Sequence, residues 1–480
     1  MVVQISIRMK AYLLSLALFV SSTVSGQIGI YSSNSSFNGK TVYKHSTGLT
    51  SFNVETRGKV ELTDNDLDVK SMSPDGYLEI TKTVFGNKRS IVITPQGNGL
   101  KREYYEGRSL VAFEPEGRKW LSEVLPELVR TTTIGAESRV NRFFRQGGAM
   151  AVVNEIKRLE SDHVKSHYAT LLMKLNIPVS DYGMIASGIA STIDSDHYLT
   201  EFLKGSMDKF LQNKTATEAL FTATQKMESD HYKTEVIREA LYSAPATIEN
   251  VRIIMIATGK MDSDHYKTEV LKALLKQNNL TDAVITEMIN TTQTIDSDHY
   301  RSVVLNKALA KPGLSATAFT KVLESVKNIE SDHYKSEVLG NLFQNNLTPE
   351  VLNSAMEVIG SIESDHYITQ VANQLVKRQN LTDENFQKLL GAMSANQSDH
   401  YMSVFLQTAL ERPSLSKENL MSILQSTSHI DSDHYITEVL TDVAYKMKGM
   451  NDASLREAYR TAAKRIESET YYGRVMRAID

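Results

Sequence analysis

The chain has 480 residues, 41% of them hydrophobic and 23% charged, which is enough for two or more packed domains and excludes a largely disordered chain. Its 53 Lys and Arg against 57 Asp and Glu give a formal net charge of −4, which provides no reason to expect a nucleic-acid partner. The absence of cysteine excludes disulfides, thiolate chemistry and cysteine-ligated metals.

Residues 1–26 have the three parts of a secretory signal peptide. Arg8 and Lys10 form a basic start, Ala11–Val20 is an apolar run, and the small residues around Val24–Gly26 offer a cleavage site. The apolar run is too short to span a hydrocarbon core of ~30 Å, although an uncleaved anchor is the alternative. We therefore expect a periplasmic or secreted bacterial protein with no membrane span after signal cleavage.

The next part of the chain changes from a loose to an alternating pattern. Residues 27–50 are rich in Ser, Thr, Asn and Gly, so we expect a flexible leader there, with a strand as the alternative. Residues 51–117 alternate and contain turn signals, which predicts an antiparallel β domain, a meander of about five or six strands. The expected strands are Ser51–Leu62, Leu67–Met72, Tyr77–Phe85, Ser90–Thr94 and Leu100–Phe113.

Residues 118–147 are expected to form connecting helices. Arg118–Val129 is a helical pattern that could cover one face of the sheet, and Ala136–Gln146 reads as a helix leading into the next region. Several basic residues recur on the expected strands and either line a solvated sheet face or bind an anionic ligand. They are Lys88, Arg89, Lys101, Arg102 and Arg108.

The tetrapeptide Ser-Asp-His-Tyr recurs through the rest of the chain, mostly every 34 residues. A variant copy begins at Ser161 and a degenerate copy at Ser468. This period predicts helical hairpins that stack into a HEAT/TPR-like α-solenoid of about ten repeats over residues 148–480, with a C-terminal cap. The full copies are Ser195, Asp196, His197, Tyr198; Ser229, Asp230, His231, Tyr232; Ser263, Asp264, His265, Tyr266; Ser297, Asp298, His299, Tyr300; Ser331, Asp332, His333, Tyr334; Ser364, Asp365, His366, Tyr367; Ser398, Asp399, His400, Tyr401; and Ser432, Asp433, His434, Tyr435.

Each repeat is expected to contain two capped helices. The motif Ser is placed to cap the first helix, and its Asp lies in the first turn, where the helix dipole favours a negative charge. A second Ser or Thr follows about eighteen residues later and is expected to cap the second helix. The residues in this position are Ser180, Thr247, Thr281, Ser315, Thr348, Thr382 and Ser416.

Side chains four residues apart share a helix face, which suggests two further contacts in every motif. Ser or Thr lies four residues after the motif Asp, so the two are expected to bond, and Glu often lies four residues after His. One interpretation is a stacking rule that produces ladders of identical side chains along one edge. The other is a partner-binding, pH-sensitive or cation-binding edge, with His163 and His167 as weak metal candidates because they are four residues apart.

A family resemblance rests on Arg57–Lys82 (RGKVELTDNDLDVKSMSPDGYLEITK) and Gly99–Arg130 (GLKREYYEGRSLVAFEPEGRKWLSEVLPELVR). These stretches resemble a segment of bacterial exported or membrane proteins with helical repeats beginning Ser-Asp-Tyr-Glu-Lys, some of which carry BlaR-type antibiotic-sensor metallopeptidase domains. The resemblance implies an extracytoplasmic accessory or sensing region and supplies no catalytic residues. This chain departs from the group in having His-Tyr in place of Tyr-Glu, and it lacks the His-Glu-x-x-His motif.

The sequence contains no nucleophile elbow, phosphate loop, dinucleotide fingerprint or zincin helix. We therefore expect a non-enzymatic scaffold of the cell envelope that binds a protein or peptide and requires no cofactor, because solenoids commonly offer extended binding surfaces. The alternative is a metal- or pH-responsive accessory protein that uses the Asp and His side chains of the repeats.

Overall fold

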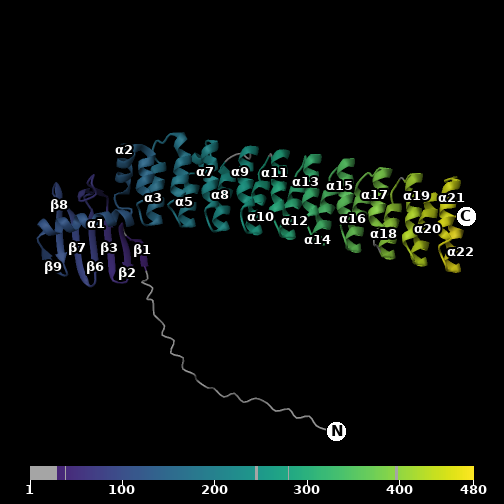
Figure 1. Ribbon diagram of the computed structural model, residues 1–480, viewed down its shortest axis with the longest axis horizontal. Helices are drawn as coiled ribbons and strands as arrows, with labels where there is room; N and C mark the ends of the chain where they lie inside the picture. The colour runs from purple at the N-terminus through teal and green to yellow at the C-terminus, as the bar shows by residue number, and fades with distance from the viewer. Residues whose placement is uncertain are drawn as a thin grey trace, which may run out of the picture. The chain divides into compact units, whose positions relative to one another are not determined.

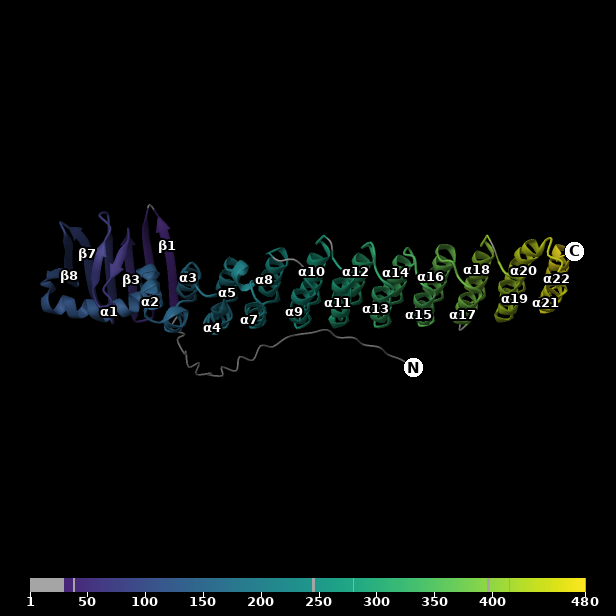
Figure 2. The ribbon, with the colours of Figure 1, turned by 90° about the horizontal axis from the view of Figure 1, so that it is seen from above.

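The computed structural model describes residues 30–37, 39–243, 247–278, 280–394, 398–413 and 415–479, with the backbone alone for 30–37. The chain forms two compact units, one ending at Ser138 and the other beginning at Arg139. Figure 1 and Figure 2 show strands in the first unit and a row of paired helices in the second. The expected signal peptide lies outside the described residues.

The first unit is built on an antiparallel sheet, as predicted. Seven strands lie in the order β1-β2-β3-β6-β7-β8-β9, and a separate hairpin of β4 and β5 is inserted between β3 and β6. The meander of the prediction is therefore confirmed. The strands are β1 (Ile30–Phe37), β2 (Lys40–Thr47), β3 (Thr50–Arg57), β4 (Val60–Leu62), β5 (Val69–Met72), β6 (Tyr77–Val84), β7 (Asn87–Gln96), β8 (Gly99–Glu106) and β9 (Ser109–Val111).

The expected flexible leader is wrong for its described residues, because β1 and β2 pair along their full lengths there and extend the sheet. Two expected strands are also divided. Gly58, with a φ of 68°, ends β3 before β4, and its left-handed backbone is one that glycine adopts readily. Gly107, with a φ of 61°, separates β8 from β9 in the same way.

The predicted helix over Arg118–Val129 is confirmed as α1 (Arg118–Thr131), and it covers one face of the sheet. Its apolar stripe packs against side chains that alternate inward along β3, β6, β7 and β8. The Trp120 ring lies 5.8 Å from the Tyr104 ring on β8. The helix therefore belongs to the core of this unit, where a connecting helix was expected.

The second unit confirms the predicted α-solenoid of helical hairpins. A kinked helix, α2 (Ala136–Ile156), leads into it and contains the predicted Ala136–Gln146 segment; the kink falls at Gly147 and Gly148. The helix that follows each motif is here called an A helix, and the second helix of each hairpin is called a B helix. A helices pack on the A helices of adjacent repeats, and B helices pack on B helices.

The A helices are α3 (Asp162–Met173), α5 (Asp196–Gly205), α8 (Asp230–Ser243), α10 (Asp264–Leu275), α12 (Asp298–Leu309), α14 (Asp332–Leu342), α16 (Asp365–Arg378), α18 (Asp399–Leu410), α20 (Asp433–Met447) and α22 (Glu469–Ile479). The B helices are α4 (Tyr182–Ala190), α7 (Lys214–Gln225), α9 (Ile248–Gly259), α11 (Asp282–Thr291), α13 (Ala316–Lys327), α15 (Pro349–Ile359), α17 (Asp383–Met393), α19 (Lys417–Ser426) and α21 (Ala453–Ala463). A short helix, α6 (Met207–Phe210), connects α5 to α7.

Six of the seven predicted B-helix caps are confirmed, because each of these Ser or Thr side chains accepts a hydrogen bond from the backbone three residues later. Ser180 is the exception. It lies inside a short 3-10 turn, Val179–Asp181, and α4 begins after that turn. In the next hairpin, Asn213 caps α7 in the role that Ser and Thr have elsewhere.

None of the helices in the described residues is both long enough and apolar enough to cross a membrane.

Candidate functional site

The motif residues lie together at the N-termini of the A helices, along one edge of the second unit. This edge is called the motif edge below. The Ser residues have the extended backbone of an N-cap, but where the cap geometry is described their hydroxyls make no capping bond. The predicted capping by Ser is therefore wrong, because these hydroxyls do not accept from the amides of the first helical turn.

The backbone in front of each A helix is instead held by the motif Asp of the preceding repeat. Each Asp carboxylate receives a hydrogen bond, 2.7–2.9 Å long, from the backbone N–H of the next Ser, and seven of them also bond the N–H one residue earlier. Each bond joins the carboxylate at the start of one A helix to the loop that precedes the next A helix. The pairs are Asp162–Ser195, Asp196–Ser229, Asp230–Ser263, Asp264–Ser297, Asp298–Ser331, Asp332–Ser364, Asp365–Ser398, Asp399–Ser432 and Asp433–Ser468.

In five repeats a cation lies beneath the motif Asp, four residues after the Ser. These cations are mostly buried, and four of them also donate to a backbone carbonyl in the loop before the next motif, at Thr192, Thr294, Asn328 and Ser361. In the other four full or variant copies the position is apolar. The cations are Lys165, Lys233, Lys267, Arg301 and Lys335, and the apolar residues are Leu199, Ile368, Met402 and Ile436.

The pKa of Asp230 records this environment. Burial alone would raise the pKa, but hydrogen bonds from Lys233 and from the amides of Ser263 and Asp262 outweigh burial, so the net effect is a lowered pKa. The Lys233 ammonium lies 2.7 Å from the carboxylate. The ionised Asp is therefore the form that joins the two repeats.

The predicted bond from the motif Asp to the Ser or Thr four residues later is also wrong. These hydroxyls face the interior, and Ser302, Ser336 and Ser403 donate to the carbonyl of the motif His three residues before them. Thr234 and Thr268 keep a buried hydroxyl with no partner among the described residues. The carboxylate points toward the next repeat, so the two groups diverge.

The motif His and Tyr side chains form a continuous ladder along the motif edge, which confirms the predicted ladder of repeated side chains. In the eight full copies the His ring lies 5.0–5.3 Å from the Tyr ring of its own motif. Each of these His rings, and that of His163, lies 5.6–6.3 Å from the Tyr ring of the next motif. The His rings of the eight full copies are exposed, and their Tyr rings are half-buried. The ladder runs from His163 to Tyr471.

A row of carboxylates accompanies the ladder, one immediately before the motif Ser in nine of the ten copies, with Gln397 as the exception. Every member is exposed, and the described structure pairs only Asp431, whose carboxylate lies 3.9 Å from Arg465. This acidic row consists of Glu160, Asp194, Glu228, Asp262, Asp296, Glu330, Glu363, Asp431 and Glu467. The motif edge therefore presents carboxylate, imidazole and phenol groups together in seven of the eight full copies.

The predicted His–Glu pairs form at one position in the described structure, where His434 lies 3.5 Å from Glu438. Three of the other Glu side chains have different partners: Lys204 pairs with Glu235, Lys272 pairs with Glu269, and Asn306 donates to Glu337. The spacing of four residues identified the shared face, but at Glu235 and Glu269 a nearby lysine ammonium makes the charge-assisted bond to the carboxylate.

The structure does not bring His163 and His167 together with a third ligand. His163 joins the ladder, its ring 5.6 Å from that of Tyr198. Partial burial lowers the pKa of His167, and the neighbouring His163 and Lys174 add to this lowering. Within the described part of the chain, no three His, Asp or Glu side chains converge as a metal site would require.

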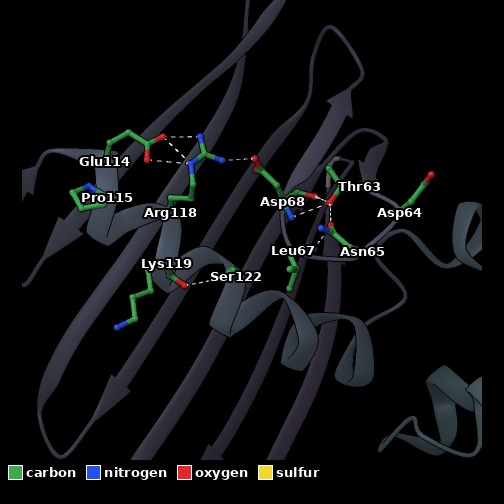
Figure 3. Close-up of a pocket in the computed structure, with 10 residues that line it drawn as sticks. All are labelled: Thr63, Asp64, Asn65, Leu67, Asp68, Glu114, Pro115, Arg118, Lys119 and Ser122. Atoms are coloured by element: carbon green, nitrogen blue, oxygen red, sulfur yellow. Dashed lines mark hydrogen bonds and ion pairs between the residues drawn. The ribbon is translucent and has the colours of Figure 1, made fainter.

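The first unit has a separate hollow of about 650 Å³ between the β4–β5 turn and the start of α1 (Figure 3). Its wall is an ion network: Arg118 contacts Asp68 at 3.0 Å and Glu114 at 2.6 Å, and Arg102 contacts Asp68 at 2.9 Å. Lys119 and Asp64 also line the hollow, on opposite sides in the figure. Because acids neutralise both arginines, the hollow offers no excess charge for an anion.

The basic residues of the strands are mostly paired as well. Arg102 bonds Asp68, Lys101 lies 3.0 Å from Glu103, and Arg89 lies 3.8 Å from Glu106. Lys88 and Arg108 are exposed and form no ion pair with another described residue. Of the five predicted candidates for an anionic ligand, these two remain available.

Comparisons with known proteins add little. No family model matches the chain, and no curated protein matches it. Among solved structures, a chain from work described as computational design of self-assembling cyclic protein homooligomers covers 72% of this chain and 98% of its own length, at 12% identity and a TM-score of 0.12. That score is too low to carry an argument, and the resemblance to BlaR-associated segments stays a prediction.

Proposed function

We propose that this protein is an exported, non-enzymatic scaffold whose motif edge binds an extended polypeptide segment. The observation that supports this most is the acidic row, which recurs before nine of the ten motif copies beside exposed imidazoles and has almost no counter-ions within the described chain. Exposed carboxylates that make no ion pair within the chain attract a cationic partner. The partner that fits is therefore a basic segment.

The spacing of the row also limits the conformation of that segment. Packed helices lie ~8–10 Å apart, which sets the step from one motif to the next. A polyproline II chain advances about 3.1 Å per residue with three residues per turn, so every third side chain faces the same way at a step of ~9 Å. We therefore expect a ligand in this conformation with a basic residue at every third position.

Fluorescence anisotropy with labelled peptides tests this proposal. A proline-rich peptide with Lys at every third position should bind more tightly than one of the same composition with its lysines in one block. Neutralising five carboxylates of the acidic row should weaken binding by at least about fivefold, because each exposed pair is worth ~0.2–1 kcal/mol. The substitutions are Glu228→Gln, Asp262→Asn, Asp296→Asn, Glu330→Gln and Glu363→Gln.

The matched control neutralises five exposed carboxylates on B helices, which should leave binding unchanged. Equal loss in both variants, or equal affinity for the two peptides, would reject the proposal. The control substitutions are Glu218→Gln, Glu249→Gln, Glu357→Gln, Glu418→Gln and Glu457→Gln.

Export is the part of the proposal that rests on sequence alone. The basic start, the apolar run Ala11–Val20 and the small residues before Gln27 support it. N-terminal sequencing of the protein recovered from a bacterial periplasm or medium should begin at Gln27. Recovery of only the full-length chain from the cytoplasm would remove export from the proposal.

A second candidate is a pH-responsive role, supported by the exposure of the motif His rings beside carboxylates. Imidazoles gain protons in mildly acid solution, which would add positive charge along the motif edge. The wild-type protein should then bind the basic peptide more weakly at pH 5.5 than at pH 7.5. This weakening should be smaller in a variant with His231→Gln, His265→Gln and His299→Gln. Equal weakening in both proteins would exclude this role.

A further inference from the structure

Three hairpin turns meet at one end of the sheet in the first unit, and together they form what is called here the sheet tip. They connect β2 to β3, β6 to β7, and β8 to β9. The amide of Phe85 donates to the carbonyl of Leu49 at 3.0 Å, and the amide of Gly107 donates to that of Lys88 at 2.8 Å. These two bonds bring the three turns side by side.

The sheet tip exposes large apolar side chains. Phe85 is 72% exposed, Leu49 is 60% exposed, and the adjoining Val84 is 36% exposed. Two cations border them, Lys88 at the start of β7 and Arg108 in the β8–β9 turn, and neither forms an ion pair with another described residue. The result is a small apolar projection with positive charge beside it.

The backbone at Phe85 does not favour the residue that is there. Phe85 has a φ of 48° and Gly86 a φ of 82°, so the turn is of the type I′ kind with both central residues in the left-handed region. Asn-Gly is the preferred pair for this turn, and a bulky aromatic residue at positive φ is an outlier. Apart from Asp66, Phe85 is the one non-glycine residue with positive φ in the described chain.

Strain of this kind persists where another property of the residue is required. The Phe85 ring does not stabilise the core, because most of it faces solvent. We infer that the sheet tip docks on an anionic lipid surface, with Phe85 and Leu49 entering the interface and Lys88 and Arg108 contacting lipid headgroups. Aromatic and aliphatic side chains partition into the headgroup boundary, and nearby cations add affinity for anionic lipid.

This inference is independent of the proposed binding of a polypeptide to the motif edge. It is tested by co-sedimentation with vesicles of phosphatidylcholine alone or mixed with phosphatidylglycerol. The chain beginning at Gln27 is used, so that the apolar run Ala11–Val20 cannot bind the lipid. We expect the chain to bind the mixed vesicles and to bind vesicles without phosphatidylglycerol much more weakly. Added NaCl should weaken the binding to the mixed vesicles.

The decisive variant is Phe85→Asn, because it separates lipid binding from folding. It creates the preferred Asn-Gly turn, so the melting temperature should stay the same or rise. Binding to mixed vesicles should nevertheless fall roughly tenfold, the effect of withdrawing one large apolar side chain from the interface. Wild-type binding by this variant would overturn the inference.

Matched controls replace side chains of similar exposure in the second unit. Tyr445→Asn corresponds to Phe85→Asn, since Tyr445 is 74% exposed, and Ile256→Ser corresponds to Leu49→Ser, since Ile256 is 59% exposed. Neither control should change sedimentation. If the controls reduce binding as much as the tip variants do, the interaction is nonspecific and the inference fails.

The charged residues have their own test. Replacing both Lys88 and Arg108 by Glu should abolish the preference for phosphatidylglycerol, whereas Lys226→Glu, at an exposed position of the second unit, should not. A preference that survives the double substitution would contradict the role given to these cations.

Discussion

The two kinds of helix start in the second unit use similar residues in different ways. B helices are capped by their own Ser or Thr, as at Thr348, whose hydroxyl accepts from the amide of Val351. A helices also begin at Ser, but the acceptor for their loop amides is the Asp of the preceding repeat. One arrangement stabilises a single helix, and the other joins consecutive hairpins. The motif therefore acts mainly as a connector between repeats.

The largest loss of stability should come from replacing a motif Asp, the residue that connects two repeats, where a buried cation lies beneath it. Asp298→Ala loses the bonds to Ser331 and Glu330 and leaves Arg301, which is 5% exposed, without its carboxylate at 3.7 Å. We expect a loss of about 3–5 kcal/mol in unfolding free energy, the usual cost of breaking a buried pair. Denaturation by guanidinium measures it, and a loss below about 1 kcal/mol would contradict the connector role.

Replacing a motif Asp by Ala should reduce the free energy of unfolding by less where the residue beneath the Asp is apolar. Asp399→Ala loses bonds to Ser432 and Asp431, but the residue four after its Ser is Met402. We expect a loss of about 1–3 kcal/mol, from the two unsatisfied amides alone. Hydrogen exchange at those amides should also quicken. If both Asp variants lose the same free energy, the cation contributes nothing to the connection.

Removing the hydroxyl that caps a single B helix should reduce the free energy of unfolding by still less. Thr348→Ala removes the acceptor for the Val351 amide and leaves the neighbouring hairpins joined, so about 1 kcal/mol should be lost. Thr348→Ser, which keeps the hydroxyl, should retain most of the stability. Faster exchange confined to the first turn of α15 would separate this local effect from that of the Asp variants.

Acid should weaken the connectors and leave the hydroxyl caps unaffected. The pKa of Asp230 is lowered in the folded protein, so the stability it contributes is present above its ordinary value of 3.8 and is lost as the pH falls below it. The melting temperature should decrease when the pH is lowered below about 4. Asp230→Asn should make the melting temperature less dependent on pH. An unchanged pH profile in Asp230→Asn would show that the carboxylate does not contribute through its charge.

The sequence predicted the hairpins well because their information is local. The 34-residue period, the apolar stripes and the Ser or Thr caps identified the A and B helices. Spacing within one helix could not show that Asp298 bonds the backbone near Ser331, because that contact depends on how successive hairpins stack. Residues four apart share a face, but Ser302 turns inward and Asp298 turns to the next repeat.

The first unit was harder to predict at its margins. The β2 sequence, Lys40–Thr47, contains few apolar residues, and its strand is defined by pairing with β3. At the sheet tip, Phe85 was included in an expected strand, because a bulky aromatic residue favours extended structure. Only the backbone shows that it lies in the turn, in a conformation that this residue rarely adopts.

The connection from Asp to the next Ser has a consequence for how the chain can change length. Every such link contains the same bond from the Ser amide to the preceding Asp, so the removal of one hairpin leaves matching partners on either side. Removing residues 263–296 would place Asp230 opposite Ser297, with Asp262 taking the place of Asp296 before it. Whole 34-residue units could thus be lost or duplicated while both ends of the protein keep their own surroundings.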